Sequence, residues 1–354
     1  MNLYGKKWTR RELEARIGRI DQIAGVQKFR MEEGPESGVE LIQVRTGAGL
    51  SYYVNTFHAM DISLAKFLGV PLSWHSVNGE VHPSYYDSRG IEWLRTAAGG
   101  LLMTCGLTSV GSPSEDGGEK LGQHGRIHHI PARQVVAESN WDGDELLMRI
   151  RGIMEENRLF GENLRLTREI RSKMGENRII IEDLVENIGF EKTPHMILYH
   201  FNFGFPLMNE HTKISFSSNK IFPRDKETPL EGCDSWQKPE IGYKERVYYH
   251  EDFESVEFEN KKRKMASVLI KNPHFPVNLK NREIPLSVRV SWDVEALPKL
   301  IEWKMPAAGV YALGIEPANC LVEGRAAERE RGTLIFLEPG ASVKYRLEVE
   351  ITSE

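Results

Sequence analysis

The most regular hydrophobic alternation in the chain runs Ile284-Pro285-Leu286-Ser287-Val288-Arg289-Val290-Ser291-Trp292. From Leu286 to Trp292, large apolar residues share one face of an extended chain, and the Ser and Arg residues between them share the other. This period of two is typical of an antiparallel strand with one face buried and one face in water. The C-terminal half of the chain is therefore expected to be rich in β-structure.

Similar signals recur on both sides of this segment. Short apolar runs bounded by turn residues predict strands at residues 39–44, 50–54, 164–170, 179–181, 196–205, 265–270, 334–337 and 343–351. Residues 145–160 suit a helix by the spacing of their Leu and Ile residues, but Gly152 and Gly161 oppose a long helix, and we favour strands. The run Lys271-Asn272-Pro273 signals a turn.

One helix is expected, at residues 9–24. Thr9 and Glu12 fit a capping box, and apolar residues follow at near-helical spacing. No repeat or low-complexity linker marks a boundary later in the chain. We therefore expect a mainly all-β protein, with a helical extension over residues 1–30 and a single β-sandwich domain over residues 31–354.

Composition excludes several classes of function. The 354 residues include 46 basic and 51 acidic side chains, and a net charge of −5 argues against a nucleic-acid partner. No run approaches the ~20 apolar residues that cross a bilayer, and the charged N-terminus lacks the apolar core of a signal peptide. Cys105, Cys233 and Cys320 are odd in number and far apart, which suits a reducing compartment. We expect a soluble cytoplasmic protein that does not bind membranes.

Two segments have the composition of cofactor-binding motifs. The glycine-rich residues 99–106 lack the Lys-Ser/Thr ending of a phosphate loop and the spacing of a dinucleotide fingerprint, so no nucleotide cofactor is expected. His124, His128 and His129 are the densest histidine cluster, but a metal site needs three or four converging ligands. We favour a loop whose imidazoles form hydrogen bonds, and we expect no metal. Cys105 is expected to pack in the core.

Three separated segments combine titratable residues with apolar or amide neighbours. They are Gly122–Arg126, Tyr199–Pro206 and Gly314–Asn319. In the second segment, residues 200 and 202 (His and Asn) point to the same face of a predicted strand whose neighbours are aromatic, which suits a sugar. In the third, Glu316 lies at a strand end, where partial burial can raise a carboxyl pKa into the range of a general base.

On these residues the chain resembles the aldose 1-epimerase, or galactose mutarotase, superfamily, in a divergent branch of aldose 1-epimerase family proteins. The resemblance extends from about Val39 to Val349. The family's ordered landmarks match His124-Gly125, then His200 with Asn202 and Phe203, then Glu316. The chain departs from the family's usual residues at Tyr199, Arg126 and Pro317-Ala318-Asn319.

The resemblance implies a galactose mutarotase-like β-supersandwich with a sugar cleft, and anomer interconversion by ring opening without metal or other cofactor. Glu316 would be the general base that takes the proton from the anomeric hydroxyl. His200 would be the general acid that protonates the ring oxygen. His124 would bind or orient the sugar, and Asn202 is expected beside it.

Further candidates for sugar binding have weaker support. They are His58, Asp61, Trp93, Arg95, Arg126, Glu245 and His250. Each has a structural alternative, because Asp61 would also suit a turn cap, Trp93 a core position, and Glu245 and His250 a solvated strand face. Arg126 and Arg95 would suit an anionic substituent on the sugar, or equally an ion pair with acidic neighbours.

The leading prediction is a mutarotase or epimerase that acts on a free or simply derivatised aldose. A non-catalytic sugar-binding or sensing protein is one alternative, although binding alone needs no paired acid and base. Another isomerase or lyase reaction in the same cleft is a second alternative, because one fold hosts many functions. The expected partner is a small sugar, and exposed strand edges would allow a homodimer.

Overall fold

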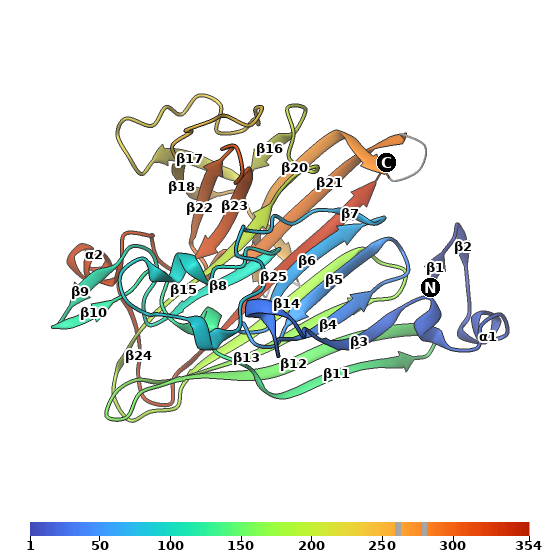
Figure 1. Cartoon of the computed structure of the whole chain (residues 1–354), viewed down its shortest axis with the longest axis horizontal. Coiled ribbons are helices and arrows are strands. Elements are labelled where there is room, and N and C mark those ends of the chain that lie inside the picture. Colours follow the sequence, from blue (N-terminus) through green and yellow to red (C-terminus); the bar gives the residue numbers. More distant parts are fainter. Residues whose placement is uncertain (259–262, 278–281, 354) are drawn as a thin grey trace.

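The computed structural model describes residues 1–258, 263–277 and 282–353. Within them, the largest sheet has nine antiparallel strands, seen as the long diagonal ribbons of Figure 1. Their order is β11 (Arg133–Asp142), β12 (Glu145–Asn157), β13 (Asn163–Lys173), β14 (Arg178–Asn187), β25 (Ser342–Ser353), β21 (Arg282–Asp293), β20 (Arg263–Val277) and β16 (Lys213–Phe216), with β19 (Val256–Phe258) paired to β20.

Two further sheets complete the main architecture of the described residues. A seven-stranded sheet has the order β17 (Ser218–Pro223), β18 (Arg246–Phe253), β22 (Lys299–Met305), β23 (Ala312–Ala318), β15 (Thr193–Phe203) and β24 (Ile335–Leu337), with β8 (Leu102–Leu107) paired to β15. A five-stranded sheet has the order β3 (Gly25–Arg30), β4 (Glu40–Arg45), β5 (Leu50–Asn55), β6 (Asp61–Phe67) and β7 (Val70–Pro71).

The remaining elements are short. Two hairpins pair β1 (Asn2–Leu3) with β2 (Lys6–Lys7), and β9 (Ser114–Asp116) with β10 (Glu119–Leu121). The α-helices are α1 (Arg10–Glu14) and α2 (Arg325–Arg331), and the 3-10 helices are η1 (Ile20–Gln22), η2 (Gly34–Glu36), η3 (Pro83–Tyr85), η4 (Glu92–Arg95) and η5 (Ile127–His129). None of the helices in the described part of the chain has the length and apolar character needed to span a membrane.

The predicted all-β architecture is confirmed. β21 pairs antiparallel with β20 and β25, and its apolar residues from Leu286 to Trp292 are buried. The ambiguous residues 145–160 form strand β12, whose burial alternates along nearly its whole length. Alternating burial in β12, β13 and β14 leaves one face of the large sheet in the core and the other accessible.

Two sequence predictions were wrong in detail. The helix expected at residues 9–24 ends at Glu14, although the capping box between Thr9 and Glu12 is present. Gly18 interrupts the apolar run at a cost of about 1 kcal/mol in a helix, and only the 3-10 turn η1 follows. The turn expected at Lys271–Pro273 is instead an irregularity within β20, where the shifted register accommodates a proline without an N–H group.

The seven-stranded sheet is buried on both faces, and this determines where a site can form. On β15, odd-numbered residues such as Tyr199 and Phe201 belong to the main core, shared with the other two sheets. Even-numbered Met196 and Leu198 belong to a second, smaller cluster. Cys105 and Cys320 lie in that second cluster, as the packing prediction for Cys105 required. The second face carries the candidate site.

Candidate active site

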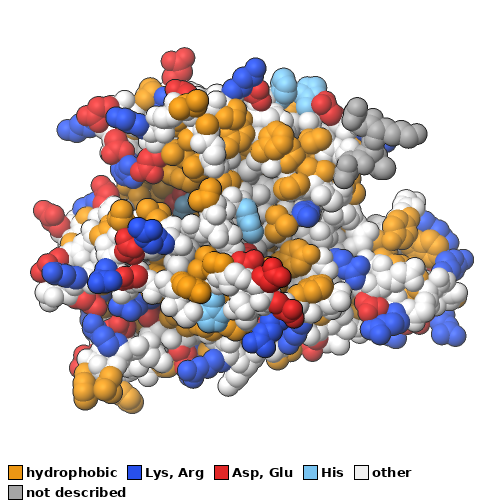
Figure 2. Space-filling model, in the orientation of Figure 1, with side chains coloured by type: hydrophobic (Ala, Val, Ile, Leu, Met, Phe, Trp, Pro, Cys, Tyr) orange, Lys and Arg blue, Asp and Glu red, His pale blue; other side chains and the backbone are white. Residues whose placement is uncertain are grey.

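A pocket of about 390 Å³ lies over the second face of the seven-stranded sheet. The floor comes from strands β8, β15, β22 and β23, and the walls come from loops and from η4. Figure 2 shows hydrophobic side chains around a hollow at the β18 and β22 end of this face. The lining includes Trp74, Trp93, Met103, Gln123, His124, His200, Arg224, Glu245, Val247, Ile301, Trp303 and Glu316. The volume and the mixed apolar and polar lining suit a small molecule.

The floor of the pocket holds a direct contact between His200 on β15 and Glu316 on β23. The His200 Nε2 atom lies 3.1 Å from the Glu316 Oε1 atom, and the two side chains are 10% and 3% exposed. They meet because β15 and β23 are paired, with Asn202 opposite Gly314. A Cβ atom on Gly314 would lie 2.6 Å from Glu316 Oε1 and 3.0 Å from His200 Cε1, so the pair needs glycine there.

Burial sets the protonation of this pair. It raises the pKa of Glu316 well above the ordinary value of 4.5, and nearby Glu245 raises it further, whereas Arg224 lowers it. Burial also lowers the pKa of His200 to about 3, with the imidazole of His124 adding to the effect. Near neutral pH burial therefore favours a protonated Glu316 beside a neutral His200, so that one transferable proton lies on Glu316.

Indole rings and an ion pair form the sides of the pocket. The ring of Trp303 lies 5.7 Å from that of His200 and 6.0 Å from that of Trp74. The Trp303 Nε1–H group donates to Glu245 Oε2 at 3.0 Å, and Arg224 donates to Glu245 Oε1 at 3.0 Å. Arg224 also pairs with Asp225. Two carboxylates thus neutralise the one guanidinium at the rim.

His124 enters the pocket from a loop that packs on β8. Its backbone has a left-handed φ of 55°, and its carbonyl accepts from Gly106 N–H. The next residue must be glycine, because a Cβ atom on Gly125 would lie 2.4 Å from the carbonyl oxygens of Gly106 and Ser109. The His124 ring lies 4.9 Å from Trp93, and burial lowers its pKa to about 4. A neutral imidazole beside an indole suits hydrogen bonding to a hydroxyl group.

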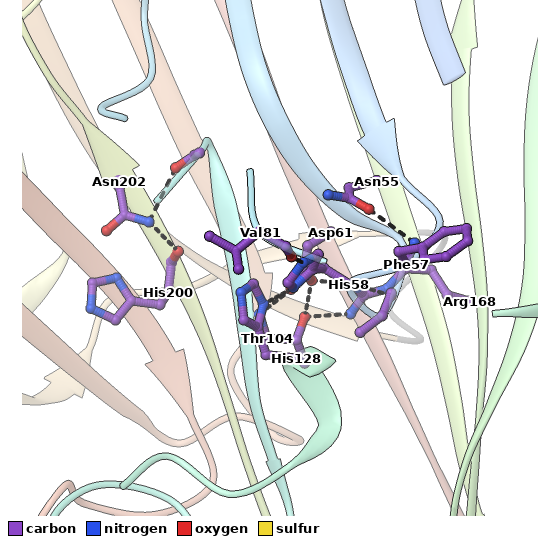
Figure 3. Close-up of polar contacts among 12 residues, drawn as sticks. Asn55, Phe57, His58, Asp61, Val81, Thr104, His128, Arg168, His200 and Asn202 are labelled. Carbon is purple, nitrogen blue, oxygen red and sulfur yellow. Dashed lines mark hydrogen bonds and ion pairs between the residues drawn. The ribbon is translucent and has the colours of Figure 1, made fainter. Parts of the chain in front are cut away.

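Trp93 was expected either to bind the sugar or to pack in the core, and its position is compatible with both. It is buried in the second hydrophobic cluster and it also lines the pocket. Asn202 lies outside the pocket lining: its amide donates to the His200 carbonyl at 3.0 Å and to the Gly100 carbonyl at 3.1 Å. Asn202 therefore positions the backbone of His200, as Figure 3 shows.

Several other candidates lie away from the pocket lining. Asp61 is buried and accepts hydrogen bonds from Thr104 and Arg168 while it contacts His128. His58 is buried against the same group. In Figure 3, His58, Asp61, Thr104 and His128 lie together, apart from His200 and Asn202.

The two arginines proposed for an anionic substituent also lie outside this lining. Arg95 is exposed and paired with Glu92. Arg126 is exposed beside a separate small cavity that includes Tyr86 and Glu162. Arg224, which sequence reasoning missed, is the arginine of the pocket. Trp74 and Trp303 were also missed, because the type of residue alone does not show whether a tryptophan lines a pocket or packs in the core.

His250 lies on the opposite face of the seven-stranded sheet. Its Nε2 atom is 3.3 Å from Glu302 Oε2, its Nδ1 atom is 2.8 Å from Ser218 Oγ, and its ring packs on Phe216. Both members of the His250–Glu302 pair are fully buried. The prediction that His250 lies on a solvated strand face is therefore wrong. Alternate residues of β18 face opposite sides of the sheet, and His250 faces away from the pocket.

A larger groove of about 650 Å³ crosses the accessible face of the nine-stranded sheet. Its arginines are matched by carboxylates on neighbouring strands, as in the pairs Arg149–Glu138 and Arg171–Glu182. Exposed pairs of this kind are typical of a solvated strand face. The smaller pocket has the buried acid–base pair, and we regard it as the candidate active site.

Solved structures with the same fold come from several bacteria. A Klebsiella pneumoniae protein described as a "putative aldose 1-epimerase" is 22% identical, with a TM-score of 0.79 over 94% of this chain and 86% of that one. A galactose mutarotase-like protein from Clostridium acetobutylicum is 13% identical, with a TM-score of 0.60 over 94% and 100%. A galactose 1-epimerase from Lactobacillus acidophilus is 12% identical, with a TM-score of 0.55 over 93% and 99%.

These likenesses establish the fold. They confirm the galactose mutarotase-like β-sandwich that the sequence resemblance implied. Among curated proteins, none has a sequence that matches this chain. The family model described as "Domain of unknown function (DUF4432)" matches residues 36–351. The chain therefore belongs to the DUF4432 family, within the galactose mutarotase-like fold.

Proposed function

We propose that the protein is a mutarotase that interconverts the α and β anomers of a free or simply derivatised aldose. The observation that carries this proposal is the 3.1 Å contact between His200 Nε2 and Glu316 Oε1 on the floor of the pocket. The anomeric hydroxyl and the ring oxygen of a sugar are bonded to the same carbon atom. An acid and a base that lie side by side can therefore reach both oxygens at once.

The proton count of the pair suits this reaction. Transfer of the Glu316 proton to His200 gives a carboxylate and an imidazolium. The carboxylate then takes the proton of the anomeric hydroxyl, and the imidazolium protonates the ring oxygen as the C1–O5 bond breaks. The products are the open-chain aldehyde, a protonated Glu316 and a neutral His200, which is the arrangement that burial favours.

Ring closure completes the cycle without any net change in the pair. The aldehyde group rotates about the C1–C2 bond and presents its other face to the sugar hydroxyl. Glu316 returns its proton to the carbonyl oxygen, and His200 takes the proton of the attacking hydroxyl. Transfer of that proton from His200 to Glu316 then restores the resting pair. Each positioned proton transfer typically contributes ~10²–10⁴-fold to the rate, and the residues of the pair supply both.

The walls favour a neutral pyranose. The rings of Trp74, Trp93 and Trp303 offer apolar surfaces to the C–H faces of a sugar. Polar groups on His124, Gln123 and Glu245 face the same space and suit hydroxyl groups. Glu245 and Asp225 already neutralise the charge of Arg224, so this arginine does not favour a phosphate, sulfonate or carboxylate on the sugar.

The test is NMR saturation exchange between α and β anomers across neutral, phosphorylated, sulfonated and uronic sugars. We expect the protein to accelerate exchange of at least one neutral aldose over its spontaneous rate, and to act on anionic sugars more slowly. Saturable binding without acceleration of any sugar would instead identify a sensor. New signals that belong to neither anomer would identify a different isomerase or lyase reaction and overturn the proposal.

A further inference from the structure

Three buried histidines from two distant segments meet behind Trp93, outside the lining of the sugar pocket. His58 lies in the turn between β5 and β6, and His128 and His129 lie in η5. The ring centroids of His58 and His128 are 4.6 Å apart, those of His58 and His129 are 5.4 Å apart, and those of His128 and His129 are 4.8 Å apart. The Ala59 N–H group donates to the carbonyl of residue 130 at 3.1 Å, which holds the two segments together.

The hydrogen bonds of His58 and His128 leave one nitrogen of each ring free. His58 Nε2 lies 2.5 Å from the Val81 carbonyl, which only accepts, so Nε2 carries the hydrogen and Nδ1 has a bare lone pair. His128 Nδ1 lies 2.7 Å from Asp61 Oδ2, which leaves Nε2. Within the described residues, neither His58 Nδ1 nor His128 Nε2 has a hydrogen-bond partner, although both are buried.

His129 completes the group. Its ring stacks on Tyr86 with centroids 4.0 Å apart and planes 6° apart, so its orientation is fixed. By strict hydrogen-bond geometry, neither ring nitrogen of His129 has a partner in the part of the chain that the structure describes, although the backbone of Thr96 lies close enough to interact with the ring. Buried polar atoms almost always find partners, so this concentration of unpartnered imidazole nitrogens in one place is unusual.

The surroundings match the shell that orients metal ligands. A ligating histidine usually donates its second N–H to a carboxylate or a backbone carbonyl, as His128 does to Asp61 and His58 does to Val81. Asp61 is itself held by Thr104 and by Arg168.

We propose that His58, His128 and His129 bind one divalent transition-metal ion of the zinc class. One ligand nitrogen from each ring lies within 4.8 Å of the other two. Tetrahedral zinc with Zn–N bonds of about 2.0–2.1 Å separates such nitrogens by about 3.4 Å, so the widest pair must close by about 1.4 Å. Imidazole ligands without carboxylate or thiolate suit zinc, copper or nickel.

The position of the site points to a structural role. None of the three histidines lines the sugar pocket, and Trp93 lies between the two regions, with ring centroids 4.9 Å from His124 and 5.8 Å from His128. The metal would tie the β5–β6 turn to η5, next to the loop that carries His124. This inference does not depend on the proposed sugar reaction, because metal content is measured directly.

The test is metal analysis of the full-length, untagged protein after growth with zinc, followed by Zn²⁺ titration of the chelator-stripped protein against a competing chelator. We expect about one zinc per chain. His58→Ala, His128→Ala and His129→Ala should each weaken affinity by at least about 100-fold, and Asp61→Asn by about 10–100-fold. His195→Ala is the matched buried control, because both ring nitrogens of His195 already have partners, and His274→Ala controls for the exposed His211–His274 pair.

A second measurement on the unmodified protein keeps the proposal testable if a variant fails to fold. X-ray absorption of the zinc-loaded wild type should show a shell with three imidazole nitrogens at about 2.0–2.1 Å. The absence of bound zinc above the level of the chelator blank would overturn the proposal. So would a shell without three imidazoles, or loss of zinc in His274→Ala alongside full retention in a folded His128→Ala.

Discussion

The seven-stranded sheet carries two buried His–Glu pairs, one on each face. His200–Glu316 faces the pocket and His250–Glu302 faces the main core, and both have Nε2–Oε distances near hydrogen-bond length, 3.1 Å and 3.3 Å. In both pairs, burial lowers the histidine pKa to about 3 and raises the glutamate pKa well above 4.5. A perturbed pKa therefore does not by itself mark a catalytic group.

Access separates the two pairs. His200 and Glu316 line a cavity with indole walls, whereas His250 and Glu302 are fully enclosed by neighbours such as Phe216. The two pairs lie on opposite faces of the seven-stranded sheet, because adjacent residues of a strand point to opposite faces. The second pair thus provides an internal control of the same chemistry without a substrate-sized space.

The largest expected effect is on turnover when the pocket-facing histidine is replaced. His200→Asn removes the general acid, and we expect kcat for anomer exchange to fall by ~10²–10⁴-fold. His250→Asn makes the same change in the enclosed pair and should leave kcat within about threefold of the wild type. NMR exchange rates for both folded variants check this, and comparable losses in the two would remove the distinction between the pairs.

A smaller loss is expected when space around the pocket-facing pair is filled. Gly314→Ala places a Cβ atom 2.6 Å from Glu316 Oε1 and 2.9 Å from the Trp303 Cβ atom, so the carboxyl must move. A displacement of about 1 Å in a reacting group can cost about 10²-fold in rate, and we expect a loss of that order. Gly18→Ala is the control, since no atom lies within 4 Å of its added Cβ. Unchanged kcat in Gly314→Ala would show that the observed contact is not needed.

A modest effect is expected at the rim. Arg224→Met removes the guanidinium that holds Glu245, which in turn accepts from the indole of Trp303. Because such partly exposed pairs are worth up to about 1 kcal/mol, KM should rise by up to about fivefold with kcat nearly unchanged. Steady-state exchange kinetics at several sugar concentrations separate the two constants. A fall in kcat as large as that of His200→Asn would place Arg224 in the chemical step instead.

The smallest expected difference between the pairs is in their effect on stability. A lowered histidine pKa makes stability rise with pH between about 3 and 6.5, and a raised glutamate pKa makes it fall with pH above 4.5. The two slopes, each about 1.4 kcal/mol per pH unit for one group, oppose each other above pH 4.5. The glutamate slope ends at the raised pKa of the glutamate, and the histidine slope ends at about pH 6.5.

Replacing either glutamate with glutamine, which does not titrate, removes its contribution to the pH dependence of stability. Relative to the wild type, both Glu302→Gln and Glu316→Gln should gain stability progressively as the pH rises above 4.5, because each lacks one falling slope. Chemical denaturation at pH 5, 6, 7 and 8 measures the difference. If stability relative to the wild type changes similarly with pH in the two variants, the two glutamates have the same protonation state in the folded protein. If this relative stability does not change with pH in one variant, its glutamate is ionised in the folded protein.

Local patterns predicted much of the fold. The alternation at residues 284–292 and the capping box at Thr9 both describe short-range geometry, and both are present. The prediction that the helix continues beyond Glu14 was wrong, because the spacing of apolar residues does not include the helix-breaking cost of Gly18. It also does not show that the following isoleucines pack against the core in a non-helical conformation. Strand β12 was predicted correctly because its glycine outweighed a helix-like spacing.

The candidate site was only partly predictable. Residues 200 and 316 were identified by their order within a family resemblance, but their contact depends on the pairing of β15 with β23. The facing of His250 could not be inferred, because Val247, Tyr248 and Tyr249 are all apolar and both faces of β18 are buried. The three-histidine group was equally hidden, since His58 precedes its partners by about 70 residues.

The most direct test of the account compares Glu316→Gln with Glu302→Gln in one NMR exchange experiment on a neutral aldose that the wild type accelerates. Both substitutions keep the size of a buried side chain and remove its proton transfer. We predict that Glu316→Gln loses at least about 100-fold in exchange rate while Glu302→Gln keeps the wild-type rate. Equal rates in the two folded variants, whether both high or both low, would contradict the assignment of catalysis to the pocket-facing pair.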